Sequence, residues 1–161
     1  MKRNIGVIAV IVLVAVVVGF SISKKSGNTS STNAEPSVNG KSVDISGQQL
    51  TTLPESVTNQ TDIISLNVSN NQLTTLPAAI GNLVNLSVLN VENNRLISLP
   101  PEIGALTKLK SADFSNNRLE SLPPELGTLT GLESLNLDGY KGPQSDIDQL
   151  KIKLPNTAIK Y

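Results

Sequence analysis

Few side chains in this sequence have the chemistry that catalysis needs. The 161 residues include no Cys and no His, which excludes disulfides, thiolate nucleophiles, zinc sites with nitrogen or sulfur ligands, and histidine as a general base. Asp146 and Asp148 form an Asp-x-Asp pair of a kind found in metal sites, but at the start of a predicted helix such carboxylates favour the helix dipole. No Ser or Lys lies in a hydrolase motif, and no glycine-rich phosphate loop is present. The sequence therefore predicts a protein that is not an enzyme and uses no metal or cofactor.

Charge is distributed unevenly along the chain. The whole sequence carries 13 basic and 13 acidic residues, but between Val43 and Tyr161 Asp and Glu outnumber Lys and Arg by twelve to eight. A protein that binds nucleic acid usually presents a basic stripe that displaces counterions from phosphates. The mildly acidic main part of the chain therefore predicts no nucleic-acid partner, and nothing in it indicates a small-molecule substrate.

Residues 1–25 contain a long apolar stretch. Residues 4–23 carry no charge, and as a helix these 20 residues would span about 30 Å, the thickness of a hydrocarbon core. A cleaved signal peptide is the alternative, but its apolar centre is usually shorter and is followed by a small-x-small cleavage site, which is poor here. The pattern favours an uncleaved transmembrane helix that anchors the chain in a membrane, and predicts a secreted protein if the segment is cleaved.

Residues 26–42 are rich in Ser, Thr, Asn and Gly and cannot bury enough apolar surface to fold by themselves. They indicate a flexible linker, of a kind that suits a domain held outside the cytoplasm. Basic residues flank the apolar segment on both sides, so the positive-inside rule scarcely decides the orientation. We expect an extracytoplasmic domain, and the opposite orientation stays open.

A period of 23 residues runs through the rest of the sequence. The phrase SNNQLTTLP begins at Ser69, ENNRLISLP at Glu92 and SNNRLESLP at Ser115. Three full copies over residues 63–131 fit the template LxxLxLxxNxLxxLPxxIxxLxx, so large apolar side chains return at the same offsets. A fixed period of this length is typical of a protein built from stacked structural repeats.

Each fixed position has a physical reason. Leu66-Asn67-Val68 alternates with period two, which predicts a short strand with Leu and Val inward and Asn outward. One strand per repeat predicts a parallel sheet whose strands are joined by crossovers along the other side. A Pro fixes φ at the start of each crossover, where a short helical or 3₁₀ turn is expected. These prolines are Pro77, Pro100 and Pro123.

An Asn stands where each strand must turn, at positions 71, 94 and 117. Its amide can pair with backbone groups that the turn removes from water, and this predicts a ladder from coil to coil. We therefore expect replacement of Asn94 by Ala to reduce stability, whereas replacement of the outward-facing Asn90 should have little effect.

The template resembles the leucine-rich repeat family, in the 23-residue variety similar to Ras-group-related plant repeats and to many bacterial ones. The resemblance implies an α/β fold: a short right-handed solenoid with a parallel β-sheet on its concave face and short helical or 3₁₀ segments on its convex face. The repeat domain is expected over residues 43–161. It would comprise a first coil (43–62), the repeats (63–131) and a C-terminal cap (132–161).

The C-terminal cap departs from the template. Tyr140 replaces the turn Asn, and a short helix is expected next, with Ser145 as its N-cap and Pro155 at its end. Ile159 is expected to close the last hydrophobic layer. The helix should turn three residues toward the core, namely Ile147, Leu150 and Leu154.

The outward face of the sheet remains available for binding. Leucine-rich repeats are generally protein-binding scaffolds, so the resemblance implies a non-enzymatic module that binds a protein or peptide through its concave face. A structural or adhesive envelope protein that contacts glycan is the alternative, although sugar recognition usually adds aromatic platforms. The candidate partner-binding residues on this face or at its edge are Asn67, Asn90, Glu92, Arg95, Asp113, Arg118, Asp138 and Tyr140.

Two of these candidates are cations at the same offset of consecutive repeats. Arg95 and Arg118 are expected about 4.8 Å apart, the spacing of adjacent strands, beside Glu92 and Asp113. Two interpretations stay open: a surface ion-pair cluster of little energetic weight, and a two-pronged anchor for carboxylates or carbonyls of a partner.

Overall fold

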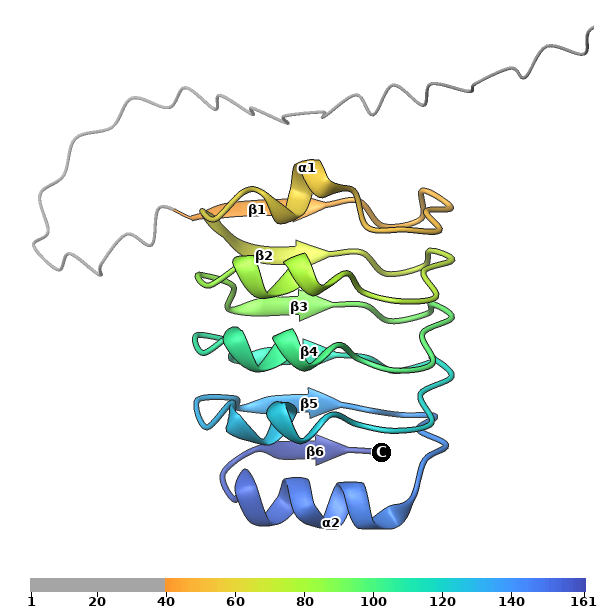
Figure 1. The fold of residues 1–161 in the computed structure, drawn as a ribbon, viewed down its shortest axis with the longest axis vertical. Helices are drawn as coiled ribbons and strands as arrows, with labels where there is room; N and C mark the ends of the chain where they lie inside the picture. Colours follow the sequence, from red (N-terminus) through yellow and green to blue (C-terminus); the bar gives the residue numbers. More distant parts are fainter. Residues whose placement is uncertain (1–39) are drawn as a thin grey trace, which may run out of the picture. The chain divides into compact units, whose positions relative to one another are not determined.

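The computed structural model describes residues 40–161 as a stack of coils, each with one strand and one return segment (Figure 1). The apolar segment of residues 1–25, with its predicted helix, and most of the linker lie outside the described residues. The elements in chain order are β1 (Lys41–Asp44), α1 (Glu55–Thr58), β2 (Ile63–Asn67), η1 (Ala78–Asn82), β3 (Val88–Asn90), η2 (Pro101–Ala105), β4 (Ser111–Asp113), η3 (Pro124–Thr128), β5 (Ser134–Asn136), α2 (Gln144–Lys153) and β6 (Ala158–Lys160).

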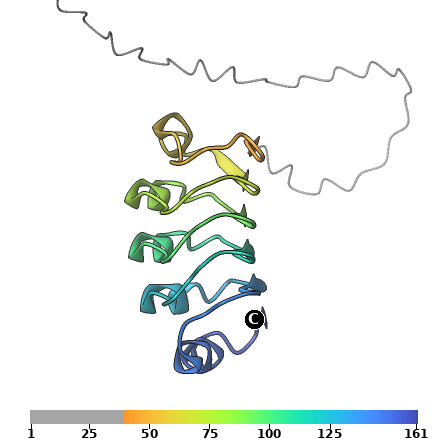
Figure 2. The same ribbon diagram turned by 90° about the vertical axis from the view of Figure 1, so that its right-hand side faces the viewer.

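The six strands form one parallel sheet in chain order. From β2 to β5 the register follows the repeat, so that Leu66, Leu89, Ala112 and Leu135 lie side by side. All four are buried, and they face a continuous core of Leu, Ile and Val from every coil. The stack curves slightly, with the sheet on the inner side and the helical turns on the outer side (Figure 2). The predicted α/β solenoid architecture is confirmed.

Return segments begin at a Pro in every coil. The φ angles of Pro77, Pro100 and Pro123 are −69°, −71° and −70°, and a 3₁₀ helix follows each. A 3₁₀ turn completes a bend in few residues, and here it turns Ile80, Ile103 or Leu126 into the core. The predicted role of these prolines is confirmed.

The turn asparagines form the predicted ladder. Asn71, Asn94 and Asn117 are each 7% exposed. In Asn94 the side-chain NH₂ donates to the carbonyls of Val68, Val91 and Glu92, at 3.0, 3.1 and 3.2 Å. No buried polar side-chain atom within residues 40–161 lacks a hydrogen-bond partner, so these amides are fully used inside the fold.

The residue before each turn Asn is left-handed, which explains the Asn-Asn pairs in the repeat. Asn70, Asn93 and Asn116 have φ angles of 57°, 54° and 54°, and Gly47 and Gly139 adopt the same conformation at the same offset in the terminal coils. Asn and Gly tolerate this region better than other residues. The first Asn therefore redirects the chain, and the second pairs the backbone groups that the turn exposes.

The end of the linker and the start of the last helix differ from the prediction. Strand β1 includes Lys41 and Ser42, which the sequence assigned to the linker, because Ser42 pairs with Ser65 and outward positions need no apolar residue. The helix α2 begins at Gln144 with Pro143 as its N-cap residue, and Ser145 makes no capping hydrogen bond. The φ of Pro143 is −68°, as in the preceding coils, so α2 is the return segment of the last coil and needs no Ser cap.

Strand β6 was not predicted. The C-terminal residues pair with β5 through Ser134↔Ala158, Leu135↔Ile159 and Asn136↔Lys160. Ile159 packs against the core as expected, and its strand covers the edge that β5 would otherwise expose.

Candidate partner-binding surface

Two columns of side chains cross the outward face of the sheet, one residue from each strand. The register aligns the central column across all six strands: Asp44, Asn67, Asn90, Asp113, Asn136 and Lys160. The same pairing aligns the second column, which is Ser42, Ser65, Val88, Ser111, Ser134 and Ala158. Three predicted site residues, Asn67, Asn90 and Asp113, are therefore neighbours.

The central column also ends the strands. The Oδ1 atom of Asn90 accepts a hydrogen bond from the backbone N–H of Glu92 at 2.9 Å, and Asp113 holds Ser115 in the same way. Asp44, Asn67 and Asn136 repeat the contact in their own coils. This local hydrogen bond is the reason that only Asn and Asp occupy the column from β1 to β5. The backbone N–H of Ser46 also lowers the pKa of Asp44, because it stabilises the ionised carboxylate.

One donor in the central column is left over. Asn67 uses its NH₂ group to reach Asp44 at 3.1 Å, and Asn136 reaches Asp113 at 3.0 Å. The NH₂ group of Asn90 has no hydrogen-bond partner within residues 40–161, although its oxygen is occupied. Asn90 therefore presents a free donor at the middle of the face.

Val88 is the large apolar residue of the second column. It is 41% exposed, and its neighbours in the register are Ser65 and Ser111. Small side chains on both sides leave the valine accessible in the middle of the sheet. The sequence signal is the interruption of a serine column by a β-branched apolar residue, and Val88 is not among the predicted site residues.

Glu92 and Asp138 lie just after the ends of β3 and β5. Glu92 is half-buried and receives a hydrogen bond from Asn116 at 3.4 Å. Asp138 forms an ion pair with Lys160 at 2.7 Å, which lowers the pKa of Asp138 and raises that of Lys160. The partner of Asp138 thus comes from the unpredicted strand β6.

Arg95 and Arg118 lie beyond the left-handed turns, on the loops that follow the strands. Arg95 donates its backbone N–H to Leu73 in the preceding coil and Arg118 donates to Leu96, both at 2.9 Å. Both side chains are exposed, and within residues 40–161 neither forms an ion pair with Glu92, Asp113 or another carboxylate. The interpretation as an ion-pair cluster is therefore wrong; a left-handed residue, Asn93 or Asn116, stands between each of these carboxylates and the Arg that follows it.

Tyr140 belongs to the cap. The side chain is half-buried against the core, and its hydroxyl donates a hydrogen bond to Asp146 on α2. Burial, followed by that hydrogen bond and the carboxylate charge, raises the pKa of Tyr140 far above its usual value. The hydroxyl is thus committed to an internal contact.

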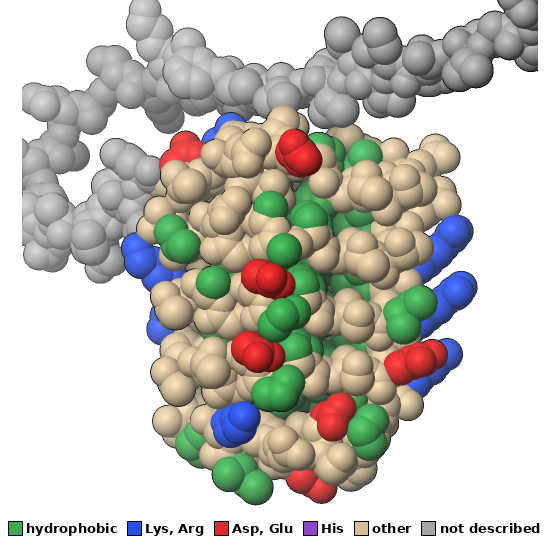
Figure 3. All heavy atoms as spheres, viewed as in Figure 1, with side chains coloured by type: hydrophobic (Ala, Val, Ile, Leu, Met, Phe, Trp, Pro, Cys, Tyr) green, Lys and Arg blue, Asp and Glu red, His purple; other side chains and the backbone are tan. Residues whose placement is uncertain are grey.

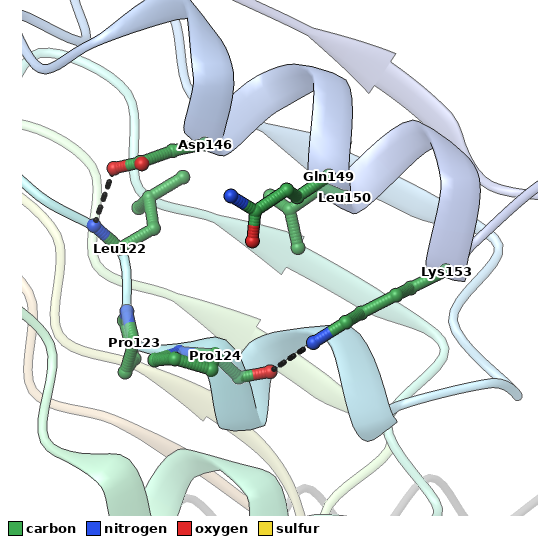
Figure 4. A pocket seen from close by; sticks show the side chains of 7 residues that line it. All are labelled: Leu122, Pro123, Pro124, Asp146, Gln149, Leu150 and Lys153. Atoms are coloured by element: carbon green, nitrogen blue, oxygen red, sulfur yellow. Dashed lines mark hydrogen bonds between the residues drawn. The ribbon is translucent and has the colours of Figure 1, made fainter.

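A hollow lies between η3 and α2, with Pro123, Pro124 and Leu150 among its walls (Figure 4). Asp146 at one end accepts a hydrogen bond from the N–H of Leu122 at 3.2 Å, and Lys153 at the other reaches the carbonyl of Pro124 at 3.5 Å. Both polar ends therefore attach the cap to the last 3₁₀ turn.

The Asp-x-Asp pair has internal partners. Asp146 holds Leu122 and Tyr140, and Asp148 accepts a hydrogen bond from Gln144 at 3.0 Å. No group of three or more acidic residues that could hold a metal ion occurs in the part of the chain that the structure describes. Among the same residues, no helix is both long and apolar enough to cross a bilayer.

Known proteins share this repeat. Two family models described as leucine rich repeat match residues 41–96 and 108–129, and no curated protein matches. A leucine-rich repeat protein of Leptospira interrogans is 39% identical with a TM-score of 0.67, over 70% of this chain and 29% of its own. An internalin of Listeria monocytogenes is 25% identical with a TM-score of 0.57, over 68% and 31%. This chain thus spans less than a third of either structure. With its coils, asparagine ladder and 3₁₀ returns, the chain belongs to the leucine-rich repeat family.

Proposed function

We propose that this chain is a non-enzymatic binding module that recognises a protein or peptide through the outward face of its sheet. Leucine-rich repeats typically bind proteins, and this supports the general class. That the partner is a protein or peptide, and that it binds on the outward face of the sheet, is our proposal. We further propose that residues 4–23, which lie outside the described residues, tether the module to a membrane.

The exposure of Val88 is the observation that carries the proposal. An apolar side chain that is 41% exposed, between two serines at the middle of a sheet, offers area that a partner can bury. Apolar contact at the centre of a polar patch is the usual anatomy of a protein interface. Glycan recognition would favour an aromatic platform, and the two columns contain none among the residues described.

The polar neighbours of Val88 suit a peptide backbone. The free NH₂ group of Asn90 can donate to a carbonyl, and the carboxylate of Asp113 can accept from an N–H group. These two residues are adjacent in the register, one strand apart. An extended segment laid across β3 and β4 would therefore find one donor, one acceptor and one apolar contact within a short distance.

Photo-crosslinking can test this surface in the full-length chain. A photo-reactive phenylalanine analogue at position 88 should crosslink a discrete protein partner in cells of the native host, identifiable by mass spectrometry. Val84 provides the matched control, because it is 46% exposed and lies in the segment that leads from η1 toward β3. The same analogue at position 84 should not crosslink that partner.

Purified partner and module can then be compared by affinity. Val88→Ser, which restores the serine column, should weaken binding with an unchanged melting temperature, whereas Val84→Ser should leave binding unchanged. Equal crosslinking from positions 84 and 88, or binding that survives Val88→Ser, would contradict the proposed surface. Binding of wall glycan with no protein partner would favour the adhesive alternative.

The tether has a separate test. Full-length protein should remain in the membrane fraction after a carbonate wash, because an apolar segment of this length inserts stably. A variant that starts near Ser26 should be released. Recovery of mature protein whose N-terminus lies just after the apolar segment would show that a signal peptidase removes it. Protease protection of the repeats in intact cells would establish their side of the membrane.

A further inference from the structure

Most cations of the repeat domain have a partner. Residues 40–161 contain nine Lys and Arg, and six of these make a side-chain hydrogen bond or ion pair inside the domain. The six are Lys41, Lys108, Lys110, Lys151, Lys153 and Lys160. The other three, Arg95, Arg118 and Lys141, have no such partner among the described residues and are exposed.

The three unpartnered cations occupy one offset of consecutive coils. Their backbone N–H groups donate to Leu73, Leu96 and Leu119 of the preceding coils, each at 2.9 Å. This second ladder holds neighbouring coils about 4.8 Å apart, as in a parallel sheet. Figure 3 shows Lys and Arg side chains projecting along the right-hand edge, where the strands end in Figure 1. We call Arg95, Arg118 and Lys141 the cationic edge.

Alternation along these loops turns the cations outward. Leu96 and Leu119 are buried, and the residues on both sides of each are exposed. The cationic edge is therefore one of two outward columns. The second column, two residues further along each loop, contains Ile97 and Glu120, joined by the backbone hydrogen bond from Glu120 to Ile97 at 3.0 Å.

Three like charges at this spacing repel one another, and no carboxylate of residues 40–161 forms an ion pair with any of them. The same offset in earlier coils is neutral, with Gln49 and Gln72, so the repeat does not require a cation there. The remainder of the domain is mildly acidic. Three adjacent cations without an ion-pair partner give this edge a positive potential, which would attract carboxylates.

Ile97 gives the edge an apolar element. It is 52% exposed and follows Arg95 by two residues on the same outward side. Glu120 adds a negative charge beside Arg118. A partner that is anionic throughout would be repelled by Glu120 and would leave Ile97 uncovered. A peptide segment that combines carboxylates with an apolar side chain fits both columns.

We propose that the cationic edge is a second interaction surface, which binds an extended acidic segment of a partner protein with an apolar residue against Ile97. Arg and Lys would pair with successive carboxylates, and the Arg forks would fix their orientation. This surface lies beyond the strand ends and does not use Val88, Asn90 or Asp113. It therefore stands or fails independently of the binding proposed for the sheet.

A labelled peptide can serve as the probe. In a fluorescein-labelled, end-capped peptide, Glu alternates with Thr and one Leu follows the last Glu. Fluorescence anisotropy at low salt, with the full chain in neutral detergent, should show binding that weakens as salt is added. The same peptide with Gln in place of Glu should not bind. Replacing all three cations by Gln should weaken binding about tenfold or more, as expected for three exposed ion pairs.

The matched control removes the same net charge elsewhere. The variant with Lys108, Lys110 and Lys151 replaced by Gln should bind the peptide as the unaltered chain does. Ile97→Thr, which introduces the residue found at position 74, should weaken binding of the Leu peptide about threefold but not of a Leu-free version. Should the triple variant misfold, Arg95→Gln with Arg118→Gln provides the same comparison, with part of the loss expected.

Three outcomes would overturn the proposal. If the two triple variants weakened peptide binding equally, the binding would depend on the net charge of the protein and not on the cationic edge. Equal affinity for the Glu and Gln peptides would show that the protein does not recognise the carboxylate groups. Tighter binding of inorganic polyphosphate than of the Glu–Leu peptide, lost in the Arg95, Arg118 and Lys141 variant, would assign the edge to a polyanion and not to a protein segment.

Discussion

The side-chain oxygen of Asn94 accepts a hydrogen bond from the backbone N–H of Leu73, 3.0 Å away in the preceding coil. Asn117 repeats this contact with Leu96, and Asn71 holds Gln48 and Leu50 of the first coil. Each Asn therefore joins two coils, and the ladder is part of the stacking that lets a short solenoid fold.

Replacement of Asn94 by Ala should destabilise the domain by about 1–3 kcal/mol, because buried carbonyl and N–H groups lose their partners. Chemical denaturation followed by circular dichroism measures the loss. Asn94→Asp keeps the size and the acceptor but cannot donate to Val68 and Val91, so it should also destabilise. If Asn94→Ala lowered the free energy of unfolding by less than about 0.5 kcal/mol, the asparagine ladder would not contribute appreciably to stability.

Asn90 is expected to contribute more than its outward position suggests. Its oxygen holds the N–H of Glu92, so Asn90→Ala should cost about 0.5–1.5 kcal/mol, above the small effect expected from sequence but below that of Asn94→Ala. Asn90→Asp retains the acceptor, as in Asp113, but places two carboxylates side by side. Its smaller cost should decrease with added salt, because salt screens exposed charges. A salt-independent cost would contradict this explanation.

The two tyrosines should titrate far apart. A hydrogen bond from Lys151 lowers the pKa of Tyr161, whereas burial and Asp146 raise the pKa of Tyr140 above 10.0. In folded protein, tyrosinate absorbance should therefore rise first for Tyr161, and Tyr140 should follow only at much higher pH. Tyr140→Phe should remove the late step, and Tyr161→Phe the early one. A single step of two groups near pH 10 would show that Tyr140 is not held by Asp146.

The same shift affects stability. The folded state keeps a proton on Tyr140 that the unfolded chain releases, so the contribution is complete below pH 10.0 and is lost as the pH rises above it. Denaturation midpoints should therefore fall less steeply above that pH in Tyr140→Phe than in the unaltered protein. At neutral pH, the variant should lose about 0.5–1.5 kcal/mol with its hydrogen bond to Asp146.

Gly104 marks a close approach between return segments. A Cβ atom there would lie 2.9 Å from Cβ of Glu125 and 3.0 Å from its carbonyl oxygen. Gly104→Ala should therefore force η2 and η3 apart and destabilise by about 1–3 kcal/mol in thermal denaturation. Gly131→Ala is the control, because a Cβ atom there would lie no closer than 3.7 Å to its nearest neighbour, the carbonyl oxygen of Thr107. Its effect on stability should stay within about 0.5 kcal/mol. Equal effects would show that the returns can separate freely.

The period alone determined most of the architecture. Parallel strands, buried Leu columns, proline-initiated returns and the ladder of Asn71, Asn94 and Asn117 all follow from residues that recur every 23 positions. Each coil must bury the same apolar layer and satisfy the same turn, so neighbouring coils use the same side chains. The sequence pattern of one coil is therefore sufficient to predict the structure of the coils that repeat it.

Only the tertiary structure shows how the C-terminal end of the solenoid is closed and which side chains are accessible on the sheet and at its edge. Strand β6, the start of α2 at Pro143 and the contact between Tyr140 and Asp146 depend on pairing at the last coil, where no repeat follows to show the register. Likewise, Arg95 and Arg118 form no ion pair with Glu92 or Asp113, although they are close in sequence and a left-handed turn lies between them. The period already places Val88 in a column of serines, and its exposure in the folded sheet is what made it a candidate. Such features depend on which segments of the chain meet in space, and the sequence of a single repeat does not contain that information.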